Sequence, residues 1–217
     1  MYLFSIVAIP LGFLLLTFLE YPREEISGAG RAVARGLICA VPVWVVARLL
    51  GALVPEIWGS PLLALREFFD RFLPYGALPA LAYAVFYHYG ERLQPGEEQR
   101  RLTAFYAGVL APFGLGEMVR LWGHPDVYSV LVLPFIVAAL ILAMPTFALA
   151  FMREYGARRI LPSGVAFFFC AVASFVRPLF LARLWPLALL AAGGLAAAAW
   201  FIGFAALDRR PSRRDAA

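Results

Sequence analysis

Apolar stretches about as long as a bilayer is thick recur along this chain and constrain its fold more than any other feature. A helix rises 1.5 Å per residue, so ~20 apolar residues cross a hydrocarbon core of ~30 Å. Such stretches occupy residues 2–19, 36–54, 73–89, 102–121, 128–152, 160–181 and 185–207. The polar stretch 20–35 is predicted as a loop. The sequence therefore predicts an all-α polytopic membrane protein, a bundle of seven transmembrane helices.

The overall composition supports the same fold class. Of the 217 residues, 63% are hydrophobic and 15% are charged. A soluble domain is closer to half apolar and a quarter charged. A chain this apolar needs lipid as its solvent. Soluble enzymes, secreted disulfide scaffolds, disordered tails and nucleic-acid-binding domains are therefore excluded.

The distribution of arginine predicts the orientation in the membrane. All 19 basic residues are arginines, and basic residues in short loops stay on the cytoplasmic side. With the C-terminus inside, thirteen arginines are cytoplasmic and four lie at or near the outer side. We expect a multi-pass protein of the cell inner (plasma) membrane with its N-terminus outside. Residues 1–208 would form one transmembrane helical domain, and residues 209–217 a basic cytoplasmic tail resting on anionic lipid.

Residues 55–72, between the second and third predicted spans, are too charged to cross a membrane. As a helix from Leu62, this stretch places Leu65 and Phe69 on one side, with Arg66, Glu67, Asp70 and Arg71 on the other. The charges also pair at i,i+4, Arg66 with Asp70 and Glu67 with Arg71. We expect an outer interfacial amphipathic helix. The alternative is a connector packed on the bundle.

Ionisable residues within the predicted spans are candidates for substrate binding, because a charge in a membrane needs a partner or a purpose. Arg48 and Arg177 would form an anion site if they faced one interior, since guanidinium groups bind carboxylate or phosphate. They would otherwise reach the outer headgroups. Glu117 and Arg120 lie three residues apart and would form an ion pair within one helix. The alternative for Glu117 is proton or cation binding in a cavity.

Two predicted spans carry small residues at four-residue spacing, a pattern that lets helix backbones approach closely in membranes. The residues are Ala104, Gly108, Gly193, Gly194, Ala197 and Ala198. We expect these faces to pack against another span of this chain or against a second protein.

The sequence has few signs of enzyme chemistry. It lacks a Gly-rich phosphate loop, a GxSxG elbow and an HExxH motif. The two histidines, His88 and His124, fall on opposite predicted faces of the membrane and cannot complete one metal site. Without lysine, the chain cannot hold retinal as a Schiff base. Cys39 and Cys170 fall in apolar stretches. We therefore expect no catalytic residue, metal or cofactor.

The leading hypothesis is a non-enzymatic subunit or scaffold of a membrane protein complex, whose partners are the lipid bilayer and another membrane protein or a second copy. The alternative is a small permease for an anionic solute that uses Arg48 and Arg177. A third class is an enzyme acting on lipid, with Glu117 as acid or base near His124.

Overall fold

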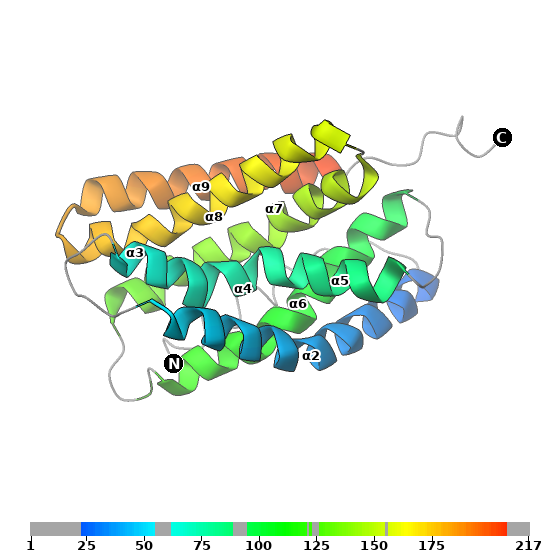
Figure 1. The fold of residues 1–217 in the computed structure, drawn as a ribbon, viewed down its shortest axis with the longest axis horizontal. Helices are drawn as coiled ribbons and strands as arrows, with labels where there is room; N and C mark the ends of the chain where they lie inside the picture. The colour runs from blue at the N-terminus through cyan, green and yellow to red at the C-terminus, as the bar shows by residue number, and fades with distance from the viewer. Residues whose placement is uncertain are drawn as a thin grey trace.

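The computed structural model describes residues 23–54, 62–88, 95–120, 122, 126–154 and 156–207, and every element in these ranges is helical (Figure 1). The predicted span 2–19 and the predicted tail 209–217 lie outside the described residues. The predictions made for them remain predictions.

The described residues form a succession of helical elements. In chain order they are α2 (Arg23–Ala52), α3 (Leu62–Glu67), η2 (Phe68–Phe72), α4 (Leu73–Tyr75), α5 (Ala77–His88), α6 (Pro95–Arg120), η3 (Tyr128–Val132), α7 (Leu133–Arg153), η4 (Gly156–Arg159), α8 (Ile160–Leu181) and α9 (Trp185–Leu207). The elements η2 and η3 are π-helical, and η4 is a 3₁₀ helix. From α3 to α5 the chain forms one broken helix with a turn at Gly76, called here the 62–88 segment.

Helices α6 and α7 lie at the centre of the bundle. Residues 102–110 of α6 are all buried, as is most of α7. Helix α2 packs along α6, while α8 and α9 pack against α7 and against each other (Figure 1). The 62–88 segment contacts α2, α6, α7 and α8. It therefore bridges the two sides of the bundle.

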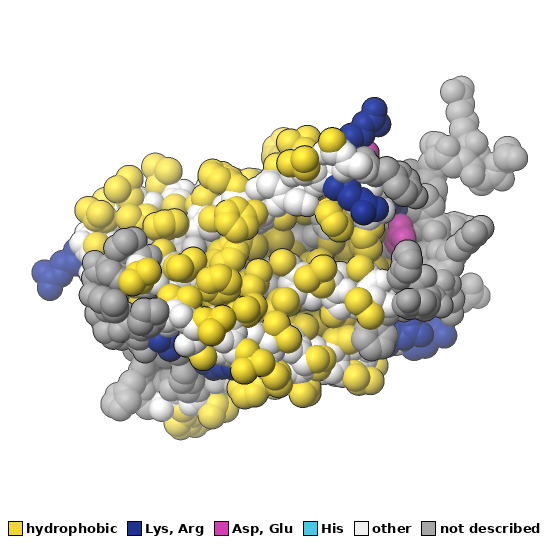
Figure 2. Space-filling view, in the orientation of Figure 1, with side chains coloured by type: hydrophobic (Ala, Val, Ile, Leu, Met, Phe, Trp, Pro, Cys, Tyr) yellow, Lys and Arg dark blue, Asp and Glu magenta, His cyan; other side chains and the backbone are white. Residues whose placement is uncertain are grey.

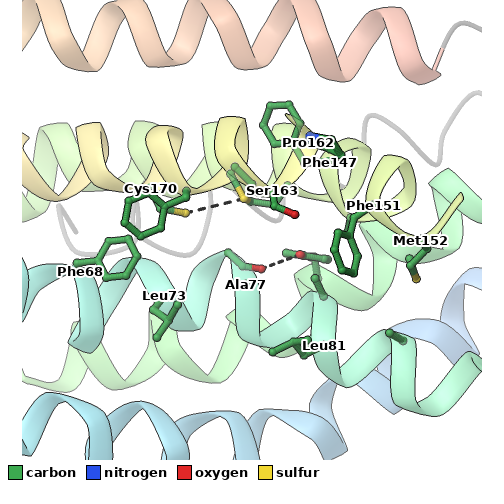
Figure 3. Close-up of a pocket in the computed structure, with 18 residues that line it drawn as sticks. Phe68, Leu73, Ala77, Leu81, Phe147, Phe151, Met152, Pro162, Ser163 and Cys170 are labelled. Carbon is green, nitrogen blue, oxygen red and sulfur yellow. Dashed lines mark hydrogen bonds between the residues drawn. The ribbon is translucent and has the colours of Figure 1, made fainter. Parts of the chain in front are cut away.

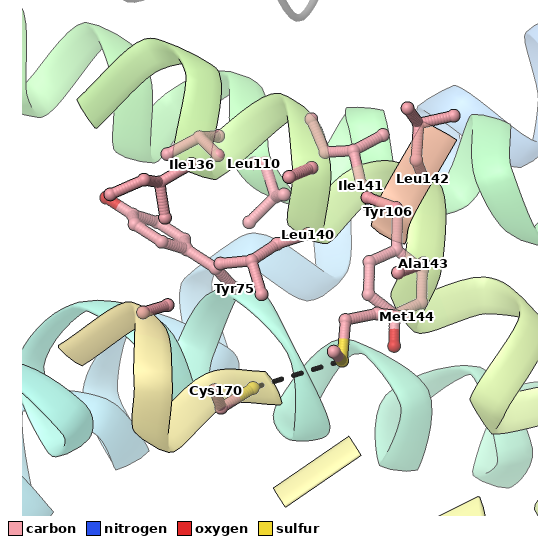
Figure 4. Close-up of a cluster of buried hydrophobic side chains, with 14 of the residues drawn as sticks. Tyr75, Tyr106, Leu110, Ile136, Leu140, Ile141, Leu142, Ala143, Met144 and Cys170 are labelled. Atoms are coloured by element: carbon pink, nitrogen blue, oxygen red, sulfur yellow. Dashed lines mark hydrogen bonds between the residues drawn. The ribbon is translucent and has the colours of Figure 1, made fainter. Parts of the chain in front are cut away.

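Side chains of α2, α4, α5, α6, η3, α7, α8 and α9 form the core, and Figure 4 shows part of it. Ile136 and Leu140 of α7 pack with Leu110 of α6, with Tyr75 and Cys170 nearby. In a membrane such side chains gain little by leaving lipid, so close packing between them stabilises the core.

Helices α2 and α6 approach so closely that glycine is required on both. A Cβ at Gly36 would collide with the Phe105 carbonyl oxygen, and a Cβ at Gly108 with the Val33 carbonyl oxygen. We call this contact the α2–α6 seam. Ala32 is also buried in α2, so packing on α6 explains why residues 23–35, predicted as a loop, are helical.

Four helical stretches in the described part of the chain are long and apolar enough to cross a membrane: Gly28–Ala52, Tyr128–Arg153, Gly156–Leu181 and Trp185–Gly203. The predicted count of seven spans is not confirmed. The element α5 is only 12 residues long, and α6 carries charged residues near both ends.

The exterior has the character expected of a lipid-facing bundle. Large apolar side chains are exposed along α2, α8 and α9. Apolar side chains cover most of the face in Figure 2, and arginines lie toward its two ends. An apolar exterior of this extent is consistent with a membrane protein.

Candidate functional site

A buried ion pair joins Glu67, at the end of α3, to Arg177 in α8, across 110 residues of sequence. The Arg177 guanidinium donates a hydrogen bond to a Glu67 carboxylate oxygen, and the side chains are 5% and 15% exposed. Each charge would be costly in such surroundings without the other. The pair therefore fixes the start of the 62–88 segment to the C-terminal part of α8.

Asp70 adds a second carboxylate one turn along the same segment. It accepts a hydrogen bond from Arg66 Nε at 3.1 Å, which confirms the predicted i,i+4 pair. A Cβ at Gly51 would collide with the Asp70 carboxylate, so Asp70 rests directly on the α2 backbone. Charged side chains thus lie where α2, η2 and α8 meet.

The predicted division of residues 62–72 into an apolar side and a charged, exposed side is wrong. Leu65 is 44% exposed, whereas Glu67 is buried. The segment packs on α2 and α8 and continues toward α5, as the connector alternative expected. The physical reason is Arg177, which gives Glu67 a buried partner that periodicity alone does not reveal. The Arg71 side chain lies outside the described residues.

Arg48 and Arg177, predicted as an anion site, have different surroundings. Arg48 is exposed on α2, and its guanidinium carbon lies 5.7 Å from the Trp44 ring centroid, within cation–π range. Arg177 bonds to Glu67. An anion would therefore meet Arg177 only after displacing a carboxylate of the chain itself.

Glu117 and Arg120 lie in the last turns of α6, but their side chains are outside the described residues, as is that of His88. His124 also lies outside them. The predicted ion pair of Glu117 with Arg120 therefore remains a prediction.

The two sets of small residues behave differently. Ala104 and Gly108 of α6 are buried, and Gly108 lies in the α2–α6 seam. On α9 the small residues Gly193, Gly194, Ala197 and Ala198 are exposed, and a Cβ on either glycine would meet nothing within 4 Å. We call these four residues the α9 small-residue face.

The structure also contains a feature that sequence reasoning missed. A groove of about 290 Å³ runs between the 62–88 segment and α8 (Figure 3). This volume is just below the ~300–1,000 Å³ typical of ligand pockets. Tyr106, Met144 and Cys170 are buried in its floor, while Leu81 and Phe167 are exposed at its rim. We call it the lateral groove.

A signal for the lateral groove was present in the sequence. Gly76, Ala80 and Ala84 recur every four residues along the 62–88 segment, and all three line the groove. Their short side chains leave space that α8 does not fill. The Tyr106 hydroxyl crosses beneath this line and donates a hydrogen bond of 2.7 Å to the Gly76 carbonyl oxygen.

These sites offer apolar surface to a ligand, with charged side chains nearby. Among the described residues, no three His, Cys, Asp or Glu side chains lie close enough together to hold a metal ion. Cys170 Sγ lies 3.9 Å from Met144 Sδ, inside the core. No protein-family model, curated protein or solved structure matches this chain.

Proposed function

We propose that this protein is a non-enzymatic subunit or scaffold of a membrane protein complex, and that it binds a membrane-spanning helix of its partner through the α9 small-residue face. One observation carries the proposal. The same residue pattern that brings α2 and α6 into backbone contact is left open on α9. As the sequence predicts, we place the protein in the inner membrane, with the C-terminus cytoplasmic.

The opposite side of α9 explains why this face is open. Ala188, Leu195 and Ala199 are buried against the bundle, which already anchors α9 to α7 and α8. Exposed Leu190 and Phe201 lie one turn before and after the small residues. The face is therefore a shallow depression between larger side chains.

A depression of this kind fits an apolar helix. Lipid tails are as apolar as leucine, so helices associate in membranes through close packing rather than through the hydrophobic effect. Glycine and alanine allow that packing, and weak Cα–H···O contacts accompany it. A partner helix with its own small residues would gain such contacts here.

The test is to replace Gly193 and Gly194 together with leucine and purify the protein from its native membrane in mild detergent. Native mass spectrometry of the intact particle would identify what stays bound. We expect the wild type to retain a stoichiometric partner helix and the double variant to lose it. Gly164→Leu is the matched control, because Gly164 is an exposed helical glycine of α8 that also has open space around its Cβ.

Two results would overturn the proposal. One is equal retention of the partner by the wild type and the double variant. The other is a lone monomer in the wild type. Loss of the partner in the Gly164→Leu control would mean that any bulky change disrupts association, which also contradicts a specific role for α9.

A small permease for an anionic solute is the alternative. Such a protein would have to exchange the Glu67 carboxylate on Arg177 for the solute during each cycle. Glu67→Gln and Arg177→Gln together remove both charges, so that neither is left buried without its partner, and this double variant would then abolish uptake of the solute by cells while the folded protein remains in the membrane. Unchanged uptake would exclude this alternative.

A further inference from the structure

The lateral groove narrows at one end and opens at the other. Phe68 of η2 contacts Phe167 of α8, with ring centroids 5.4 Å apart, and the Glu67–Arg177 pair lies beyond this contact. From there α5 and α8 diverge toward the end where α7 connects to α8 (Figure 1). The open end is lined by Phe151, Met152 and Pro162 (Figure 3).

The length of the groove matches one leaflet of a bilayer. Along α8 its lining runs from Pro162 to Cys170, about 12 Å at 1.5 Å per residue. A single leaflet contributes about half of the ~30 Å hydrocarbon core. The groove therefore accepts an apolar group that enters from one side of the membrane and ends near the midplane.

The lining of the groove has no charged side chain. The Tyr106 hydroxyl, its most deeply placed polar group, already donates to Gly76. Buried Met144 adapts its shape readily, because its side chain is unbranched and flexible. The part of a ligand that fits inside is therefore a flexible hydrocarbon.

Positive charge lies at the open end. Arg159 of η4 lies over the ring of Phe151, with its guanidinium carbon 5.2 Å from the ring centroid, and Phe151 itself lines the groove. Arg158 beside it is exposed. Figure 2 shows arginine side chains, and an acidic side chain, next to the apolar hollow at this end of the molecule. The open end of the apolar groove therefore carries the guanidinium groups of Arg158 and Arg159, and Arg159 also donates a hydrogen bond to the Glu154 carbonyl oxygen.

We propose that the lateral groove binds one acyl chain of an anionic phospholipid, with the lipid phosphate at Arg158 and Arg159. An apolar slot one leaflet long with guanidinium groups at its mouth is complementary to this amphiphile, since guanidinium binds phosphate well. The lipid would fill the space between α5 and α8 and hold the open end at a fixed width. This inference does not depend on the α9 small-residue face.

The test uses the full chain in nanodiscs that contain a trace of phospholipid with a photoreactive group near the end of one acyl chain. Phosphatidylglycerol and phosphatidylcholine probes with identical chains differ only in the headgroup, which is anionic in the first and zwitterionic in the second. After illumination, labelled peptides are mapped by mass spectrometry. We expect phosphatidylglycerol to label the lining of the groove in α5, α7 and α8 more strongly than phosphatidylcholine does.

Variants distinguish the contribution of the apolar lining of the lateral groove from that of the arginines at its open end. Ala84→Phe and Ala77→Phe, made separately, each place a ring in the groove and should abolish labelling of its lining. Because Ala77 is an exposed lining residue, we expect the Ala77→Phe variant to fold. Arg158→Gln should reduce phosphatidylglycerol labelling about fivefold, as expected for the loss of one basic residue near the membrane surface. The matched controls are Ala34→Phe and Arg31→Gln, which change exposed residues of α2 outside the groove.

Several outcomes would overturn the proposal. Equal labelling by both probes would show that the arginines do not select an anionic headgroup. Labelling spread evenly over the exposed faces of α2 and α9 would mean that the groove holds only bulk lipid. Competition by free oleate that exceeds competition by unlabelled phosphatidylglycerol would assign the slot to a fatty acid. Labelling that survives both groove-filling variants would show that the chain binds elsewhere.

Discussion

Helices α6 and α9 both carry small residues at four-residue spacing, yet their surroundings differ. In α6, Gly108 lies against the backbone of α2, and in α9, Gly193 and Gly194 face open space. The pattern itself is the same in both helices. What differs is whether another helix of the same chain brings its backbone to the face. Small-residue spacing therefore predicts the capacity for close approach but does not identify the occupant.

Two ion pairs show the same contrast, because one is buried within the bundle and the other lies at its surface. Glu67 and Arg177 are 5% and 15% exposed. In the second pair, Arg153 Nη2 of α7 lies 2.9 Å from Glu98 Oε2 of α6. The Glu98 and Arg153 side chains are 32% and 51% exposed. A buried charge that loses its partner costs far more than an exposed one, because water or headgroups can solvate the exposed charge.

The largest expected effect comes from breaking the buried pair. Glu67→Gln leaves the Arg177 charge without its carboxylate and should lower the free energy of unfolding by ~3–5 kcal/mol. The measurement is unfolding in a denaturing-detergent titration, followed by circular dichroism. Glu98→Gln is the control and should cost at most ~1 kcal/mol. Equal losses in the two variants would show that the buried pair contributes no more than a surface pair.

The next largest effect concerns the α2–α6 seam. Gly108→Ala puts a methyl group against the Val33 carbonyl, so the helices must separate, and overpacking of this kind costs ~1–3 kcal/mol. Gly194→Ala is the matched change on the open face of α9 and should cost nothing. Both variants can be compared by thermal unfolding in detergent. The contrast between seam and open face fails if Gly194→Ala is as destabilising as Gly108→Ala.

The smallest effect compares the two faces of α9 itself. A Cβ at Gly203 would lie 2.9 Å from Leu142 Cδ2 and 3.1 Å from the Leu142 carbonyl oxygen. Gly203→Ala should therefore cost about 1 kcal/mol, because the leucine methyl can shift but the backbone cannot. Gly193→Ala on the other face should be neutral or slightly stabilising, since alanine favours a helix more than glycine does. Thermal unfolding of the two single variants and of the double variant would measure both changes in stability. A greater loss of stability in Gly193→Ala than in Gly203→Ala would contradict the assigned faces.

The helical fold class was predictable because hydrophobic stretches of the right length dominate this sequence. The predicted spans 160–181 and 185–207 match α8 and α9 to the residue. The prediction failed around Glu67, where a charged helix was expected to face outward. Its partner, Arg177, lies 110 residues away, and nothing in the local pattern links the two.

The candidate sites were predictable only in part. The small residues of α6 and α9 were identified from their spacing, but the sequence does not tell which of them another helix covers. The lateral groove was missed because it arises from the divergence of α5 and α8. A cavity of this kind depends on the angle between helices, and short side chains such as Ala80 and Ala84 only permit it.

The separation of Glu67 and Arg177 along the chain also has a consequence for biosynthesis. Ribosomes add about 5–20 residues per second, so the 110 residues between the two take about 6–22 s to make. During that interval Glu67 has emerged while its cation has not. The 62–88 segment can therefore settle into its final place only after α8 has been inserted, so the last third of the chain completes the assembly of a segment made much earlier.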